Sequence, residues 1–132
     1  MSKSPKIGVI FFHKDIKLLY SERWIEKSVG SIANQSIQNF KIYEINYGGD
    51  DFTVTKYIEN KGIETLFVSR SLENHAEAMN FIIDKAFSDG CDYVFNTNLD
   101  DYYHTERIEK QITKLEEGYD IVTSDFCYVE EI

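Results

Sequence analysis

The chain has 132 residues, a size that suits one domain built around one hydrophobic core. Hydrophobic residues make up 42% of the sequence and aromatic residues 14%, which indicates a packed globular interior and excludes a disordered chain. The formal net charge of -9 argues against nucleic acid as a partner, because proteins bind phosphate backbones with a surplus of Lys and Arg. A small phosphorylated ligand is compatible with this charge if a divalent cation lies between protein and phosphate.

Two absences narrow the class of protein further. No apolar run is long enough to span a bilayer, and the opening residues MSKSPK have no apolar segment behind their charges. We therefore expect a cytoplasmic protein without a transmembrane segment. Pro5 is the single proline and no Gly/Ser-rich linker interrupts the sequence, so residues 1–132 are expected to form one domain.

The first half of the chain alternates between strand and helix patterns. Residues 6–12 are apolar and β-branched or aromatic, which predicts a buried strand. Apolar residues at helical spacing predict a helix over residues 21–33, with Ser21 as its N-cap. Residues 40–45 alternate like a strand and end at a Gly-bearing acidic turn, residues 46–51.

The same alternation continues through the second half. Three more segments have the pattern of a strand: residues 63–68, 92–96 and 119–124. Three segments are predicted to be helical: residues 52–59, a weak helix; residues 74–87, with Ala76, Met79, Ile83 and Ala86 on the apolar face; and a helix that Thr105 caps and Gly118 ends. Strands and helices that alternate in this way predict an α/β fold, a three-layer α/β/α structure around a mainly parallel sheet.

Polar clusters follow three of the predicted strands, at residues 13–15, 46–51 and 98–101. In parallel sheets ligands bind beyond the carboxyl ends of the strands, so these clusters are expected to share one rim. An isolated pair such as Asp100 and Asp101 is more often a turn whose carboxylate caps backbone N–H groups. The alternative is a hard-cation site, in which Asp100 and the amide of Asn98 offer oxygen atoms to Mg²⁺ or Mn²⁺.

Several short motifs occur in a characteristic order. The chain has S-x-x-x-Q from Ser31 to Gln35, then the turn at residues 46–51, then Asn74-x-Ala76 with Asn80, and then Asn98-Leu99-Asp100 followed by Asp101. No G-x-G-x-x-G or P-loop follows the first strand. The order and spacing resemble the N-terminal, nucleotide-sugar-binding half of a family 2 glycosyltransferase of the GT-A fold, over nearly the whole chain. Asn46 and Tyr47 stand where that family often has carboxylates, and Asn98 stands at the first Asp of its D-x-D motif.

The resemblance implies a nucleotide-sugar donor, expected to be a UDP-sugar, bound with Mn²⁺ or Mg²⁺ and transferred to an unknown acceptor (a glycan, a protein or a small molecule). It implies metal ligation by Asp100 and Asn98, with weaker metal affinity than two carboxylates would give. The residues that it implies for donor binding are Phe12, His13, Asn46, Asp51, Asn80, Asn98, Leu99 and Asp101. For His13, a structural role without nucleotide contact is as compatible with the sequence.

The resemblance does not assign a catalytic residue, because the acidic general base of the family lies in a later, acceptor-binding half. The acceptor half is expected to be short or absent here, so two readings stay open: a piece of a larger glycosyltransferase, or a nucleotide-sugar-binding or assembly module without transfer activity. An incomplete sheet edge near Ile132 would favour a homo-oligomer.

Overall fold

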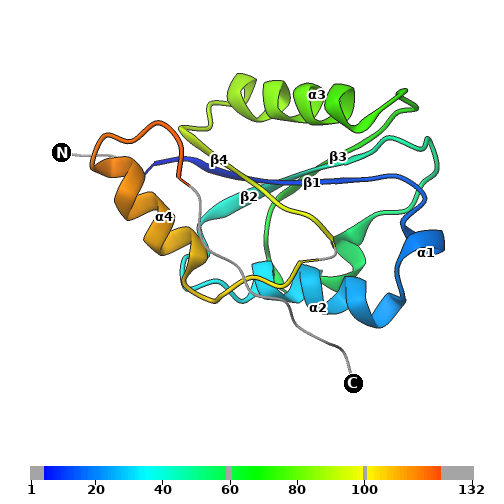
Figure 1. Ribbon diagram of the computed structural model, residues 1–132, viewed down its shortest axis with the longest axis horizontal. Helices are drawn as coiled ribbons and strands as arrows, with labels where there is room; N and C mark the ends of the chain where they lie inside the picture. The colour runs from blue at the N-terminus through cyan, green and yellow to red at the C-terminus, as the bar shows by residue number, and fades with distance from the viewer. Residues whose placement is uncertain (1–4, 59–60, 100, 123–132) are drawn as a thin grey trace.

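The computed structural model describes residues 5–58, 61–99 and 101–122. These residues form a four-stranded sheet with helices on both faces (Figure 1). The elements in chain order are β1 (Ile7–His13), α1 (Ile16–Leu19), α2 (Glu22–Ala33), β2 (Phe40–Asn46), the 3₁₀ helix η1 (Val54–Tyr57), β3 (Thr65–Ser69), α3 (His75–Ser88), β4 (Tyr93–Asn96) and α4 (Arg107–Glu116). No helix within the described ranges is long and apolar enough to cross a membrane.

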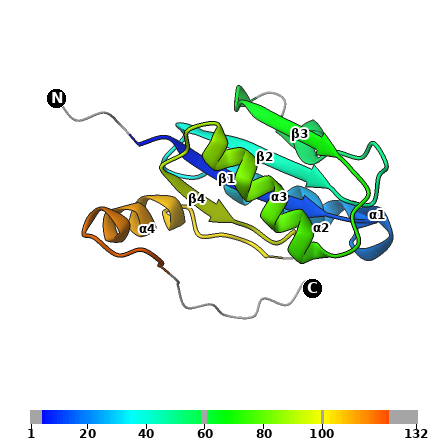
Figure 2. The ribbon, with the colours of Figure 1, turned by 90° about the horizontal axis from the view of Figure 1, so that it is seen from above.

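All four strands are parallel, in the order β3-β2-β1-β4 (Figure 2). In the β1–β2 register Ile7 lies opposite Phe40, and His13 lies opposite Asn46. Since the strands are parallel, their carboxyl ends share one edge of the sheet. β1 lies between β2 and β4, so the segments that follow these three strands are neighbours along that edge.

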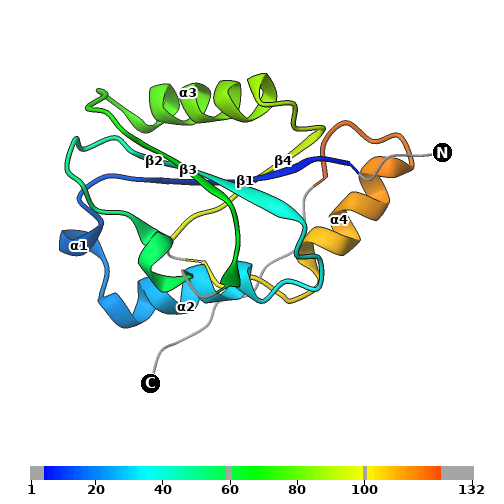
Figure 3. The same ribbon diagram turned by 180° about the vertical axis from the view of Figure 1, so that it is seen from behind.

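Side chains alternate between the two faces of the sheet, and each face has its own core. α3 covers one face, where Ile10, Tyr43 and Ile82 are buried together (Figures 1 and 3). α1, α2, η1 and α4 lie on the other side, where Val9 and Ile42 pack in one cluster with side chains of α2 and α4. The predicted three-layer α/β/α architecture is therefore confirmed.

Side chains cap the first turns of α2 and α3, and the predicted cap of α2 is confirmed. The Ser21 hydroxyl accepts a hydrogen bond from the backbone N–H of Trp24 at the start of α2. Asn74 caps α3 in the same way, through the N–H of Glu77. At the end of α4 the chain turns through Gly118, at φ 108°, a left-handed conformation that glycine adopts without steric cost.

Other details of the prediction were wrong. α3 buries Ala78, Ile82 and Ala86, so its core face is rotated from the predicted one: Ala76 is exposed, and Met79 and Ile83 are only half-buried at its margin. The short helix predicted over residues 52–59 is the single turn η1. Residues 119–122 form no strand, and residues 123 and 124 of that prediction lie outside the described residues.

Thr105 was also wrongly predicted to cap α4. The helix begins at Arg107, and its flanking residue Glu106 makes no side-chain cap. The side-chain oxygen of Gln35 instead accepts the backbone N–H of Ile108, at 3.0 Å. A remote, buried side chain therefore replaces the local cap that the sequence suggested.

Candidate functional site

A pocket of about 560 Å³ opens at the carboxyl edge of the sheet, between the segment after β1 and the turn after β2. α1 supplies apolar side chains to its wall, and the turn supplies carboxylates and one aromatic ring. Its lining residues are Asp15, Ile16, Leu18, Asp50, Asp51, Phe52, Thr53 and Lys56. The ammonium group of Lys56 lies 5.2 Å from the centroid of the Phe52 ring. The pocket thus combines an apolar surface with hydrogen-bond acceptors.

Asn46 shapes the turn over residues 46–51 from within. Its side chain is fully buried; its amide nitrogen donates to Asp50 and to the Phe52 carbonyl, and its amide oxygen accepts the N–H of Gly48. The Asp50 carboxylate also accepts the N–H of Phe52. Because its hydrogen-bonding atoms are engaged inside the protein, Asn46 holds the pocket wall in this structure, and its contact with a donor stays a prediction.

Two backbone positions near the pocket have a positive φ. Gly49 has φ 86°, a conformation that side-chain-bearing residues rarely adopt. Asp15 has φ 52° and ψ 36°, in the left-handed region that Asp and Asn tolerate better than most residues. These two turns bring Asp15 and the β2 turn to the same pocket.

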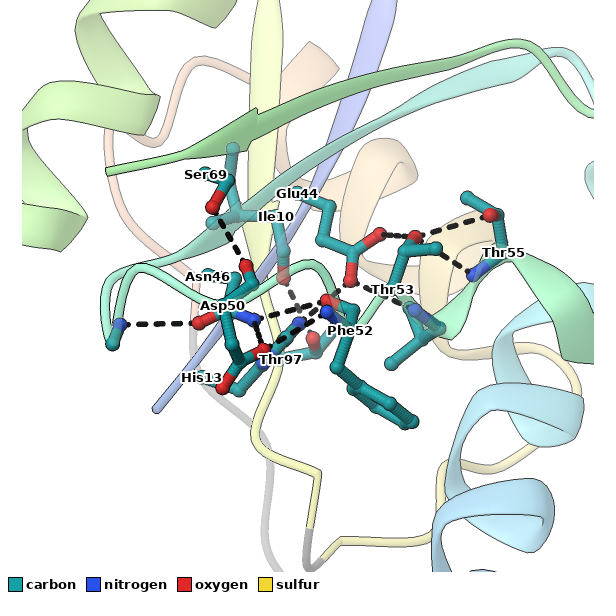
Figure 4. A network of polar contacts seen from close by, with 12 residues as sticks. Ile10, His13, Glu44, Asn46, Asp50, Phe52, Thr53, Thr55, Ser69 and Thr97 are labelled. Atoms are coloured by element: carbon teal, nitrogen blue, oxygen red, sulfur yellow. Dashed lines mark hydrogen bonds and ion pairs between the residues drawn. The ribbon is translucent and has the colours of Figure 1, made fainter. Parts of the chain in front are cut away.

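A buried polar network supports the pocket floor, as Figure 4 shows. Glu44 is fully buried, and its carboxylate accepts hydrogen bonds from the Thr53 hydroxyl at 2.6 Å and the Val54 N–H at 2.8 Å. The Nε2 atom of His13 lies 2.6 Å from the same carboxylate. Since a carboxylate accepts, Nε2 carries the proton. The ring of His13 packs edge-on against Phe52.

The network assigns His13 a structural place, with the side chain 3% exposed and Nδ1 buried without a hydrogen-bond partner among the described residues. Sequence reasoning missed Glu44 altogether. One signal was present, a single acid within the apolar strand pattern FKIYEI. A charge in a buried strand requires partners, and here they come from His13 and from the segment that closes the turn.

The acidic loop, residues 98–101, follows β4. Asn98 and Asp101 are exposed, and the Asn98 amide nitrogen lies 3.4 Å from the Asp101 carboxylate. Leu99, predicted to contact the donor, is 4% exposed and belongs to the core between the sheet and α2. Asp100, the predicted metal ligand, lies outside the described residues.

The remaining predicted donor contacts lie on the α3 side. Phe12 alternates with His13, packs with the α3-side core and stacks on His75, with 6.1 Å between ring centroids. Asn80 is exposed on α3. Of the predicted residues, the structure therefore places Asp51 in the pocket, His13 and Asn46 beneath it, and Asn98 and Asp101 together in the acidic loop.

Two side chains near this edge of the sheet, Tyr47 and Arg107, have shifted pKa values. Burial, with a contribution from the nearby Asp15 carboxylate, raises the pKa of Tyr47 above its ordinary value. Burial lowers the pKa of Arg107 beside the acidic loop, while Tyr103 and Asp101 act in the opposite direction. The Arg107 guanidinium donates to the Asn96 carbonyl through one nitrogen, and its other terminal nitrogen is buried without a partner within the described part of the chain.

A divalent cation fits the type of atoms on the acidic loop, although the described residues do not by themselves form a complete protein cage. Among the described residues no group of three His, Cys, Asp or Glu side chains could hold a metal ion. Asn98 and Asp101 nevertheless present amide and carboxylate oxygens, the ligands that Mg²⁺ and Mn²⁺ prefer. Such a partial site suits an ion that takes its remaining ligands from water and phosphate oxygens.

Comparison with known proteins identifies the family to which the chain belongs. Residues 9–130 match the family described as "Glycosyl transferase family 2". Over 135 residues the chain is 30% identical to an uncharacterized glycosyltransferase of Haemophilus influenzae (strain ATCC 51907 / DSM 11121 / KW20 / Rd), an alignment that covers 100% of this chain and 39% of that protein. The chain thus spans about two fifths of the length of this relative.

Solved structures share the fold. The crystal structure of S. aureus TarS superposes with a TM-score of 0.64 at 19% identity, covering 85% of this chain and 20% of that one. The structure of TarS 1–349 in complex with UDP gives the same TM-score and identity, with 85% and 32% covered. Taken with the family match over residues 9–130, these similarities show that the chain belongs to glycosyl transferase family 2 and has the GT-A fold.

Proposed function

We propose that this chain binds a nucleoside diphosphate sugar of the UDP type, together with Mn²⁺ or Mg²⁺, for transfer of the sugar to an acceptor. One observation carries the proposal: a pocket with carboxylates and an oxygen-bearing loop lie at the same edge of the sheet, on either side of the end of β1. A nucleoside and a diphosphate need these two kinds of surface side by side.

The nucleoside belongs in the pocket. Phe52 and Leu18 offer apolar surface for a base, and Leu18 is 85% exposed. The carboxylates of Asp15 and Asp51 are suited to accept hydrogen bonds from ribose hydroxyls or a base N–H. A bare diphosphate would be repelled by these carboxylates, so the phosphates belong nearer the acidic loop, where the bound cation would offset the negative charge of loop and phosphates.

Asn98 and Asp101 would hold the cation together with Asp100. When bound, the ion would offset the charge that develops on the leaving diphosphate as the bond to the sugar breaks. His13 and Asn46 act beneath this site: their hydrogen bonds fix the turn that carries Asp51, and we do not assign them to donor contact.

UDP is the first nucleotide to test, because UDP is bound in one of the structures that share this fold. The acceptor and the catalytic base are not assigned to any residue. A nucleotide-sugar-binding module without transfer activity is the alternative to a transferase domain.

Calorimetric titration of the purified chain with UDP, in Mn²⁺ and in EDTA, tests the proposal. We expect binding that Mn²⁺ strengthens, and an Asp51→Ala variant that binds UDP several-fold more weakly in both conditions, because one or two hydrogen bonds are lost. The matched control is Asp84→Ala, an exposed carboxylate on α3. Equal UDP affinity with and without Mn²⁺ would contradict the metal-dependent donor site.

A second assay separates transfer from binding. Hydrolysis of a UDP-sugar, or sugar transfer to added glycans, by this chain alone would exclude the binding-module alternative. UDP-sugar binding without turnover in either reaction would favour it.

A further inference from the structure

The acidic loop is held in place by α2 and not by its own backbone alone. Ser28, Ser31 and Gln35 follow one another at helical spacings of three and four residues and lie on one side of α2 and its C-terminal extension. They are 1%, 6% and 2% exposed. Three buried polar side chains beside an apolar helix face require hydrogen-bond partners.

Their partners lie in the segment between β4 and α4. The Ser28 hydroxyl donates to the Asn98 carbonyl at 3.3 Å, and the Ser31 hydroxyl accepts the N–H of Tyr103 at 3.0 Å. Gln35 donates to the His104 carbonyl at 2.7 Å. The segment is therefore attached to α2 at three successive points.

Tyr103 connects this attachment to the candidate cation ligands. Its hydroxyl accepts the backbone N–H of Asn98 at 2.7 Å and lies 3.4 Å from the Asn98 carbonyl. Its ring is covered by the guanidinium of Arg107, 4.5 Å from the centroid. The ring and the backbone of Tyr103 are thus both held, and the hydroxyl meets both polar groups of the Asn98 backbone.

We propose that Tyr103 is a positioning residue for the cation-binding loop: its hydroxyl fixes the backbone of Asn98, so that the oxygen atoms of the loop are in place before the cation and the diphosphate bind. This inference rests on the function proposed above. Its physical basis is preorganisation, since a loop that is already ordered loses less conformational entropy when a ligand binds. Removing the hydroxyl should therefore weaken the part of binding that depends on the cation.

Two conservative variants test the inference. Tyr103→Phe removes the hydroxyl and keeps the ring that Arg107 covers. The matched control is Tyr102→Phe, which removes a hydroxyl from the adjacent tyrosine, 65% exposed and without a hydrogen bond in the described part of the chain. UDP affinity is measured by calorimetry for both variants and the wild type, in Mn²⁺ and in EDTA.

We expect Tyr103→Phe to lose about fivefold or more in UDP affinity in Mn²⁺, the scale of one lost hydrogen bond. Its affinity in EDTA, and both affinities of Tyr102→Phe, should match the wild type. A general structural defect would instead lower both affinities of Tyr103→Phe. Amide hydrogen exchange at Asn98 gives a readout without ligand and should be faster in Tyr103→Phe alone, because that N–H loses its acceptor.

The outcomes separate the two proposals. A wild-type chain that gains no UDP affinity from Mn²⁺ overturns the proposed function, and the role of Tyr103 with it. If the wild type gains affinity from Mn²⁺ and Tyr103→Phe keeps that gain, or if Asn98 exchange is unchanged, the positioning role of Tyr103 alone is overturned.

Discussion

Glu44 illustrates how a single buried side chain fixes the position of a functional turn. Its carboxylate joins β1 and β2 to the segment that closes the turn, through His13, Thr53 and Val54. All three contacts are donors, so the site is matched to a group that only accepts hydrogen bonds. The pocket wall is therefore set by a residue that is itself fully buried.

We predict that Glu44→Gln lowers the free energy of unfolding by about 1–3 kcal/mol, because the new amide N–H₂ would face donors and leave buried groups unpaired. Urea denaturation measures the difference. Glu26→Gln, the same substitution at an exposed position of α2, is the control and should unfold like the wild type. Equal unfolding of Glu44→Gln and the control would show that the network contributes little.

At the scale of elements, α2 and α4 are joined through one amide. Gln35 donates to the carbonyls of Ser31 and His104 and accepts the N–H of Ile108. Local sequence favoured Thr105 as the cap of α4, since threonine is a common N-cap residue. The actual acceptor is separated from Ile108 by 73 positions in the sequence, and such a contact depends on how the two helices pack.

Gln35→Ala should destabilise the fold by about 1–3 kcal/mol, because it leaves the buried N–H of Ile108 and two carbonyls without this partner. The loss should appear first as faster amide exchange at Ile108 and the first turn of α4. Lys27→Ala, on the exposed side of α2, serves as the control. Unchanged exchange at Ile108 would mean that Gln35 does not cap α4.

At the scale of the whole molecule, the candidate site and an ionic cluster lie at opposite ends of the strands. At the amino ends of the strands, Asp89 accepts hydrogen bonds from Lys41 and from the Tyr43 hydroxyl, and pairs with Lys6 at 3.3 Å. These contacts hold the pKa of Asp89 well below its usual range, and the hydrogen bond from Lys41 has the largest effect. At the carboxyl ends of the strands, Asp15 and Asp51 instead line the candidate pocket.

The lowered pKa of Asp89 predicts how stability depends on pH. A carboxyl with a lower pKa in the folded state stabilises the protein above its unfolded pKa of about 3.9, and this contribution is lost as the pH falls below that value. Asp89→Asn should therefore be less stable than the wild type at pH 7, and the difference should shrink between pH 5 and pH 3. Urea denaturation of both proteins at pH 7, pH 5 and pH 3 measures this difference. A difference in stability that does not change with pH would contradict the lowered pKa of Asp89.

Much of this architecture follows from the sequence, because buried strands and amphipathic helices leave strong periodic patterns. The predicted ends of β1, β2, β3 and β4 agreed with the structure within a residue or two, and the three polar clusters follow strands that end at one edge of the sheet. What the pattern does not contain is pairing across the sheet. The contact of His13 with Glu44 depends on the register of the strands, and the burial of the Asn46 and Leu99 side chains depends on packing. No local signal in the sequence specifies either.

The most direct test of the donor site is the effect of Asp100→Ala on the ratio of UDP affinities measured in Mn²⁺ and in EDTA. If Asp100 ligates the cation that holds the diphosphate, the wild-type chain binds UDP more tightly in Mn²⁺, and the variant loses about tenfold or more of that gain while its affinity in EDTA is unchanged, since a cation site depends strongly on its carboxylates. An Asp100→Ala variant that retains the full Mn²⁺ effect would contradict the proposed site.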